Sequence, residues 1–138
     1  MYDYQPNPRT LRLPLEGCQV LLVEDNDDSR EVATILLEAE GATVNAVACV
    51  KEARASLDGS IPDVLVSDIG MPDRDGYDLI RAIRLRPPEL GRNIPAIALT
   101  SLSSEKDRQA TFDAGFEAHL CKPVEPAELV SIIKGLTG

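Results

Sequence analysis

Five residues that could take part in chemistry stand at equivalent points of the sequence, each at the end of a short apolar run. Glu24 and Asp25 follow QVLLV, Asp68 follows DVLVS, Thr100 closes AIALT, and Lys122 follows EAHLC. Three carboxylates close together repel one another unless a cation holds them, and Mg²⁺ favours oxygen ligands. A carboxylate can also attack phosphorus to give an aspartyl phosphate. If the fold gathers them, these residue types predict a magnesium-assisted phosphoacceptor.

Each of these residues also has an ordinary structural role open to it. Asp25 or Asn26 could cap the helix that follows, and Thr100 is a β-branched residue typical of strands. Lys122 could be a solvated surface charge, and Asp68, which precedes a glycine-containing loop, could be a turn former. The phosphoacceptor hypothesis rests on the coincidence, because four separate elements each carry a polar group at the same position.

Short apolar segments alternate along the chain with segments of helical spacing, and this alternation would position the polar residues. We expect strands at residues 19–24, 43–48, 63–67, 96–100 and 117–121. Helical spacing follows the strands, first at Val32, Ile35, Leu36 and Ala39, and last at Leu129, Ile132, Ile133 and Leu136. Five such βα units predict an α/β fold, a doubly wound parallel sheet with helices on both faces. Ligands of such sheets lie beyond the carboxyl ends of the strands, where the five polar residues would meet.

Composition and charge limit the class of protein. The chain has 138 residues, 43% hydrophobic and 27% charged, which predicts one globular domain. We place that domain at residues 18–138, after an extended arm or linker at residues 1–17 that holds three prolines. The net charge of −9 argues against a nucleic-acid partner, since binding to a phosphate backbone needs a basic surface. There is no apolar run of membrane-spanning length and no signal-peptide core, so we expect a cytoplasmic protein without membrane contact.

Four segments in this order resemble the receiver domain of two-component response regulators: VLLVEDN, PDVLVSDIGMPDRDGYDLI, IPAIALTS and AGFEAHLCKPV. The resemblance covers about residues 18–138. It implies the flavodoxin-like fold, a five-stranded parallel sheet of order 2-1-3-4-5 flanked by five helices. It also implies that Asp68 accepts a phosphoryl group from a histidine kinase or a phosphotransfer protein, in a phosphorelay rather than as an enzyme.

The resemblance assigns roles to the other site residues. Glu24 and Asp25 resemble the acidic pair that serves Mg²⁺ together with Asp68, and the backbone carbonyl of Gly70 would be a further metal ligand. Thr100 resembles the hydroxyl that moves toward the phosphoryl group. These assignments describe a Mg²⁺-dependent switch.

The last strand carries one match and one departure. Lys122 resembles the cation that pairs with the phosphoryl group, and the Lys122–Pro123 peptide is expected to be cis. The family usually has Tyr or Phe three residues before this lysine, but here that position is His119, the only histidine in the chain. His119 is either a partly buried strand residue or a ring that moves with Thr100.

Several contexts fit such a domain. The segment LRLPLEG resembles linkers that precede the C-terminal receiver of hybrid histidine kinases, and AHLCKP is also common there, so we favour that context. A stand-alone response regulator and a degenerate docking module are alternatives. A phosphatase with an aspartyl intermediate fits less well, because such sites place a second aspartate where this chain has Gly70. A flavin protein would need a Ser/Thr-Gly-rich loop where this chain has EDNDDS.

Overall fold

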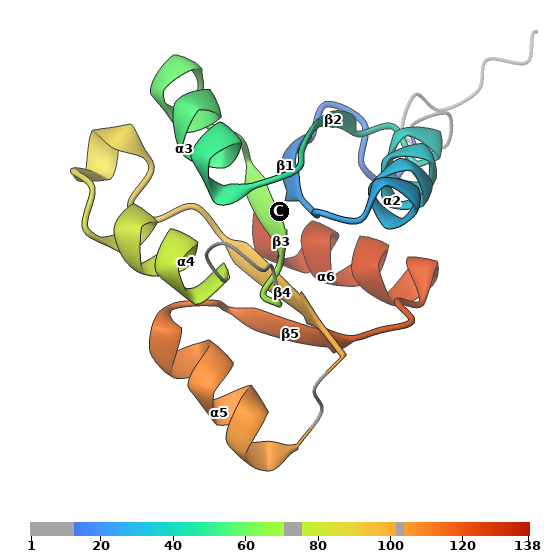
Figure 1. Ribbon diagram of the computed structural model, residues 1–138. Helices are drawn as coiled ribbons and strands as arrows, with labels where there is room; N and C mark the ends of the chain where they lie inside the picture. Colours follow the sequence, from blue (N-terminus) through green and yellow to red (C-terminus); the bar gives the residue numbers. More distant parts are fainter. Residues whose placement is uncertain (1–12, 71–75, 102–103) are drawn as a thin grey trace, which may run out of the picture.

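The computed structural model describes residues 13–70, 76–101 and 104–138 of the chain (Figure 1). Strands and helices alternate along the chain. The elements are β1 (Gln19–Val23), α2 (Asp27–Ala39), β2 (Thr43–Val47), α3 (Val50–Gly59), β3 (Val64–Asp68), α4 (Gly76–Arg84), the 3₁₀ helix η1 (Pro88–Leu90), β4 (Ala96–Thr100), α5 (Glu105–Ala114), β5 (Ala118–Cys121) and α6 (Pro126–Thr137).

The described strands form one parallel sheet in the order β2-β1-β3-β4-β5. β1 pairs in parallel with both β2 and β3, and β3 and β4 continue the sheet to β5. Every residue of β3 and of β4 is buried, as expected for central strands covered on both faces. The predicted doubly wound fold of order 2-1-3-4-5 with five α-helices is confirmed for the described part of the chain.

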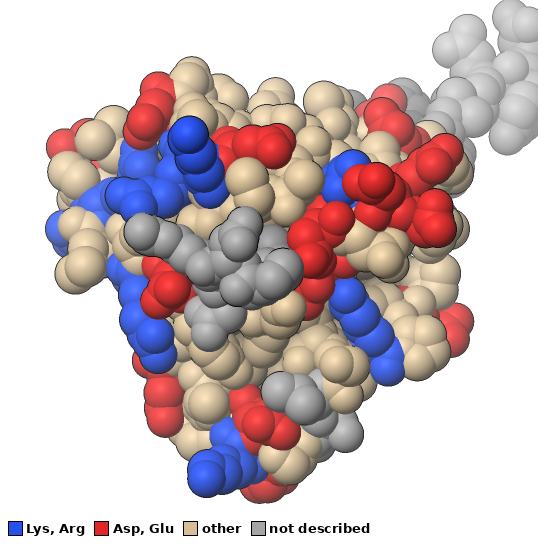
Figure 2. All heavy atoms as spheres, in the orientation of Figure 1, with Lys and Arg blue, Asp and Glu red and all other residues tan. Residues whose placement is uncertain are grey.

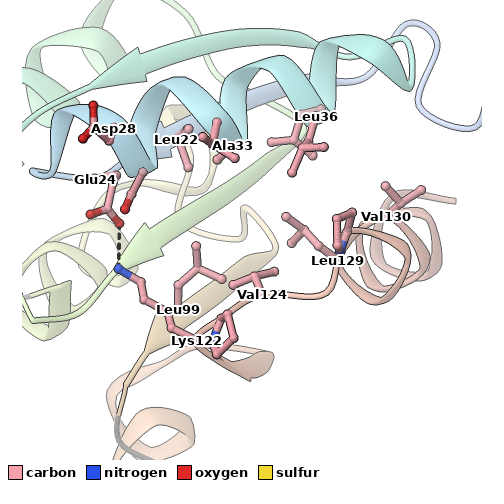
Figure 3. A pocket seen from close by; sticks show the side chains of 15 residues that line it. Leu22, Glu24, Asp28, Ala33, Leu36, Leu99, Lys122, Val124, Leu129 and Val130 are labelled. Atoms are coloured by element: carbon pink, nitrogen blue, oxygen red, sulfur yellow. Dashed lines mark hydrogen bonds and ion pairs between the residues drawn. The ribbon is translucent and has the colours of Figure 1, made fainter.

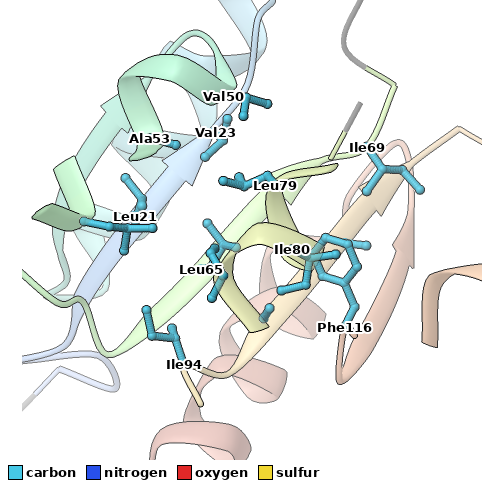
Figure 4. Close-up of a cluster of buried hydrophobic side chains, with 14 of the residues drawn as sticks. Leu21, Val23, Val50, Ala53, Leu65, Ile69, Leu79, Ile80, Ile94 and Phe116 are labelled. Carbon is cyan, nitrogen blue, oxygen red and sulfur yellow. The ribbon is translucent and has the colours of Figure 1, made fainter. Parts of the chain in front are cut away.

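Two clusters of buried apolar side chains, one on each face of the sheet, hold the helices against it. On one face, α3, α4 and α5 cover a cluster that includes Leu21 and Leu65 from the sheet and Ile80 from α4 (Figure 4). On the other face, α2 and α6 cover a cluster that includes Leu22 from the sheet and Ile133 from α6. Burial of these side chains is the main favourable term that fixes the strands, and so the ends of the strands, in place.

The helical spacing in residues 32–39 indicates α2 correctly but does not mark its buried face. Leu37 is the buried residue of α2, at 1% exposure, and Ala33 packs partly against the same cluster. Val32 and Ile35 are 56% and 57% exposed, and Leu36 is also exposed. The helix therefore turns a large part of its apolar stripe outward.

Three further predictions concern the Lys122–Pro123 peptide bond, the N-terminal segment and membrane contact. The Lys122–Pro123 peptide is cis, as expected. Leu15 is buried in the cluster under α2 and α6. The boundary between an arm at residues 1–17 and a domain at residues 18–138 stays a prediction, and residues 1–12 lie outside the described residues. None of the helices described is long and apolar enough to cross a membrane.

Candidate functional site

The polar residues selected from the sequence meet at the carboxyl edge of the sheet. Asp68 and Thr100 are the last residues of β3 and β4, while Glu24 and Lys122 directly follow β1 and β5. Because β1 lies beside β3, Glu24 and Asp25 come next to Asp68. One oxygen from each of these three carboxylates lies within 4.8 Å of the other two. The predicted acidic cluster is therefore present.

Lys122 lies against two of the three carboxylates. Its Nζ is 3.0 Å from Oε2 of Glu24 and 3.3 Å from Oδ2 of Asp68. The Lys122 main-chain N–H also donates to the carbonyl oxygen of Thr100 at 2.7 Å. Glu24 and Asp68 are 2% and 8% exposed, so this ammonium neutralises charge in a region with little access to water.

The ion pair changes the acidity of both partners. Burial raises the pKa of Glu24, and the hydrogen bond from Lys122 only partly opposes this rise. Burial alone would lower the pKa of Lys122, but its hydrogen bond to Glu24 and the negative charge of Asp68 outweigh that effect and raise the pKa. The site therefore pairs a cationic Lys122 with the Glu24 carboxylate, whose ionisation is opposed by burial.

Hydrogen bonds in the loop between β1 and α2 hold the acidic pair Glu24 and Asp25. Asn26 caps α2, because its side-chain oxygen accepts a hydrogen bond from the Ser29 N–H at 2.8 Å. The Asn26 N–H in turn donates to Oε1 of Glu24 at 3.2 Å. Of the two residues that could cap this helix, Asn26 is therefore the cap and Asp25 is not. Asp25 precedes the cap and is exposed, with its carboxylate left at the mouth of the cluster.

Arg30 belongs to the site, although sequence reasoning did not select it. From the second turn of α2 its Nη1 donates to the carbonyl oxygen of Glu24 at 3.0 Å, and its Nη2 donates to Oδ1 of Asp27 at 2.6 Å. The signal in the sequence was its isolation, because EDNDDSRE contains one basic residue among five acidic ones.

The remaining predicted residues lie around this centre. The Gly70 N–H donates to Oδ1 of Asp68 at 3.0 Å, and Gly70 is exposed beside that carboxylate. Thr100 is buried, at 3% exposure. His119 is partly buried and pairs in register with Ala98 of β4. Since side chains alternate along a strand, His119 lies on the same face of the sheet as Thr100.

His119 has an unusual local environment. Its Nε2 is buried, and no hydrogen-bond partner for this atom is found among residues 13–70, 76–101 and 104–138. Buried side-chain nitrogens usually have a partner. The position agrees with a partly buried strand histidine, and its role as a ring that moves with Thr100 stays a prediction.

An apolar groove of about 410 Å³ opens beside the site, between α2 and α6 (Figure 3). Glu24 and Lys122 lie at one end of it, joined by their ion pair. Leu36, Leu129 and Val130 line the rest. The outward-facing apolar residues of α2 are therefore continuous with a hollow that begins at the site.

The donor set suits Mg²⁺. Carboxylate and carbonyl oxygens are the ligands this ion prefers, and it usually needs only one or two protein carboxylates. Figure 2 shows Asp and Glu side chains gathered over α2, which supplies the negative potential that attracts a divalent cation. The residues present therefore fit the predicted metal.

Comparison with known proteins agrees with this geometry. An uncharacterized 14.6 kDa protein of Leptolyngbya boryana is 43% identical over 120 residues, which are 87% of this chain and 90% of that protein. Hybrid signal transduction histidine kinase D of Dictyostelium discoideum is 34% identical over 86% of this chain, but the match spans only 8% of the kinase.

A solved structure extends the likeness to the site. The receiver domain of a sensor histidine kinase from Pseudomonas aeruginosa has a TM-score of 0.80 and 36% identity, over 88% of this chain and 98% of that domain. It is described with a magnesium ion coordinated in its active-site cleft. The family model of the response regulator receiver domain matches residues 20–134. Together with the sheet order and the converging carboxylates, this match shows that the chain belongs to the response regulator receiver domain family, the signalling domains of two-component systems.

Proposed function

We propose that this chain accepts a phosphoryl group on Asp68 from a phosphorylated histidine of a kinase or phosphotransfer protein, with Mg²⁺ bound, in a cytoplasmic phosphorelay. The observation that carries the proposal is the cluster of Glu24, Asp25 and Asp68 with Lys122 bridging two of them. A structural role alone does not account for three carboxylates at one point of a sheet edge, since they repel one another.

The transfer step exchanges one bond at phosphorus for another. A carboxylate oxygen of Asp68 supplies the electron pair of the new O–P bond, while the N–P bond of the donor breaks and its electron pair stays on the imidazole. Such a step needs mainly positioning and charge neutralisation. Oδ1 of Asp68 already accepts a hydrogen bond from the Gly70 N–H, which leaves Oδ2, beside Lys122, as the oxygen we assign to attack.

We assign Asp25 and Asp68, with Glu24 and the carbonyl of Gly70, as the residues that would hold Mg²⁺. When bound, the ion would supply positive charge that offsets the negative charge of the phosphoryl oxygens. Lys122 adds a second positive charge from the β5 side. Its ion pair with Asp68 supports this role for Lys122 when Asp68 carries a phosphoryl group.

The switch would run through Thr100 at the end of β4. Thr100 is buried next to the site, and its carbonyl accepts the Lys122 N–H, so the two residues are linked through the main chain. Movement of the Thr100 hydroxyl toward the phosphoryl group would change the space beside His119 on the same face of the sheet. We therefore assign His119 as a reporter of that movement.

A receiver from a hybrid histidine kinase is the context we favour, because a hybrid kinase is among the relatives. A stand-alone response regulator is the alternative, and the similar Leptolyngbya protein has nearly the length of this chain. The same Asp68 chemistry serves both contexts.

Incubation with Mg²⁺ and acetyl phosphate, followed by intact-mass measurement, tests the proposal. We expect one added phosphoryl group on the wild type and none on Asp68→Asn, which keeps the size of the side chain. Chelation of the metal should abolish the addition. Equal labelling of the two proteins would remove Asp68 from its assigned role.

A further inference from the structure

Arg30 of α2 contacts the main chain of the acidic pair Glu24 and Asp25, at the Glu24 carbonyl. Its side chain is 23% exposed and is held at both ends of its guanidinium, by the Glu24 carbonyl and by the Asp27 carboxylate. A positive charge in the first turns of a helix opposes the helix dipole. The i,i+3 ion pair with Asp27 offsets this effect, whereas the contact with the Glu24 carbonyl reaches a residue outside the helix.

The Glu24 carbonyl that Arg30 holds belongs to the peptide group that joins Glu24 to Asp25. The Glu24 N–H is fixed as well, because it donates to the Val47 carbonyl at 3.1 Å. With both main-chain groups of Glu24 fixed, the orientation of the next peptide plane is set. Asp25 directly follows that peptide plane, and one of its carboxylate oxygens lies within 4.8 Å of an oxygen of Glu24 and of Asp68.

We propose that Arg30 is a positioning residue for the metal site, which holds the Glu24–Asp25 peptide so that the Asp25 carboxylate points toward Asp68. The inference rests on the proposed function, in which Asp25 is a metal ligand. It adds a residue that acts through the main chain and touches neither metal nor phosphoryl group.

The opposite effect of Arg30 is electrostatic repulsion of a divalent cation. That effect is weakened here, because the bond to Asp27 places a carboxylate against the guanidinium. Positioning and repulsion predict opposite results when the charge is removed, since loss of positioning weakens Mg²⁺ binding and loss of repulsion strengthens it. The sign of the change therefore separates the two.

The test is a Mg²⁺ titration of the unphosphorylated full chain, followed by the NMR shifts of the Asp25 and Asn26 amides. Arg30→Gln removes both the positive charge and the guanidinium that donates to two acceptors. Arg30→Lys keeps the charge but has no guanidinium. We expect both variants to weaken Mg²⁺ affinity by about 10- to 100-fold, the range for residues that orient metal ligands. Arg108→Gln, which removes an exposed arginine from α5, is the matched control and should bind like the wild type.

A second readout needs no metal. Amide hydrogen exchange at Asn26, whose N–H donates to Glu24, should become faster in both Arg30 variants and not in Arg108→Gln. Unchanged or tighter Mg²⁺ binding by Arg30→Gln, relative to Arg108→Gln, would overturn the inference. A wild-type chain that binds no Mg²⁺ would instead refute the metal site of the proposed function.

Discussion

Glu24 is the most deeply buried of the three carboxylates at this site, and Lys122 neutralises its charge through an ion pair. A buried ion pair rarely adds stability, because removal of two charges from water costs more than weak pairing returns. The raised pKa of Glu24 expresses that cost, since burial favours the protonated form. The pair is therefore not primarily a stabilising contact, which agrees with the metal site that we propose.

This arrangement predicts a pH dependence of stability. Because the folded-state pKa of Glu24 is raised, the folded chain binds the proton more tightly than the unfolded chain does. As the pH rises from the ordinary glutamate pKa through the folded pKa, that contribution to stability is lost. Thermal melts without metal should therefore show the wild type gaining stability relative to Glu24→Gln as the pH falls from neutral toward about 4.3.

Glu31→Gln is the control for this measurement, because it removes one exposed carboxylate from α2. The difference between wild type and Glu31→Gln should change little over the same pH range. If the difference between wild type and Glu24→Gln is also constant, the ionised form of Glu24 carries no burial cost.

At the scale of elements, the junction between β3 and α4 sets the position of Asp68. A Cβ on Gly76 would lie 2.8 Å from the Asp68 carbonyl oxygen and 2.9 Å from Cα of Ile69. The Gly76 N–H also donates to the Ile69 carbonyl at 3.3 Å. The first turn of α4 therefore lies directly against the end of β3, and only glycine allows that approach.

We expect Gly76→Ala to destabilise the fold by about 1–3 kcal/mol, because both close neighbours are main-chain atoms that cannot move aside without shifting the strand. Denaturant unfolding measures this change. Gly135→Ala is the matched control, since a Cβ there meets nothing within 4 Å and Gly135 lies inside α6. That variant should gain about 0.5–1 kcal/mol. Equal effects of the two substitutions would mean that β3 and α4 are not tightly joined.

The elements also show what could and could not be predicted from the sequence. Central strands such as Ala96–Thr100 are continuous apolar runs, so their ends, and the residues on them, could be located from the pattern. The buried face of α2 could not, because Val32 and Ile35 are as apolar as Leu37 and the packing of the helix against the rest of the fold decides which of them is covered. The contact of Arg30 with Glu24 could not be predicted either. Its acceptor is a main-chain carbonyl oxygen, which every residue has, so the residue types give no sign of it.

At the scale of the whole molecule, the parallel topology makes one site from distant parts of the chain. Glu24 and Lys122 are 98 positions apart in the sequence, yet they lie 3.0 Å apart. Their distance depends on three strand pairings, β1 with β3, β3 with β4 and β4 with β5, so the site exists only in the folded state. The resemblance to known receivers supplied that order, which alternation of strands and helices alone does not specify.

The outward face of α2 follows from the same topology and concerns the phosphodonor. In the function that we propose, a protein donor brings its histidine into contact with Asp68 and so covers the surface around the carboxyl edge of the sheet. Val32 and Ile35 are more than half exposed on the helix that borders the groove beside Lys122. Exposed apolar side chains so close to a site mark a contact surface. We therefore infer that the donor packs against this face of α2.

Replacement of Val32 and Ile35 by Ser should slow transfer from a phosphorylated histidine protein that labels the wild type, by about tenfold for each apolar side chain replaced. Labelling by acetyl phosphate should not change, because a small donor needs no protein surface and both residues lie outside the acidic cluster. Leu85→Ser is the matched control. Leu85 is 83% exposed, but it follows the last residue of α4, on the side of the amino ends of the strands and away from the site. Equal slowing by the Leu85 and α2 variants would show that the donor has no preference for α2. A parallel loss of acetyl phosphate labelling would place the defect in the Asp68 site itself.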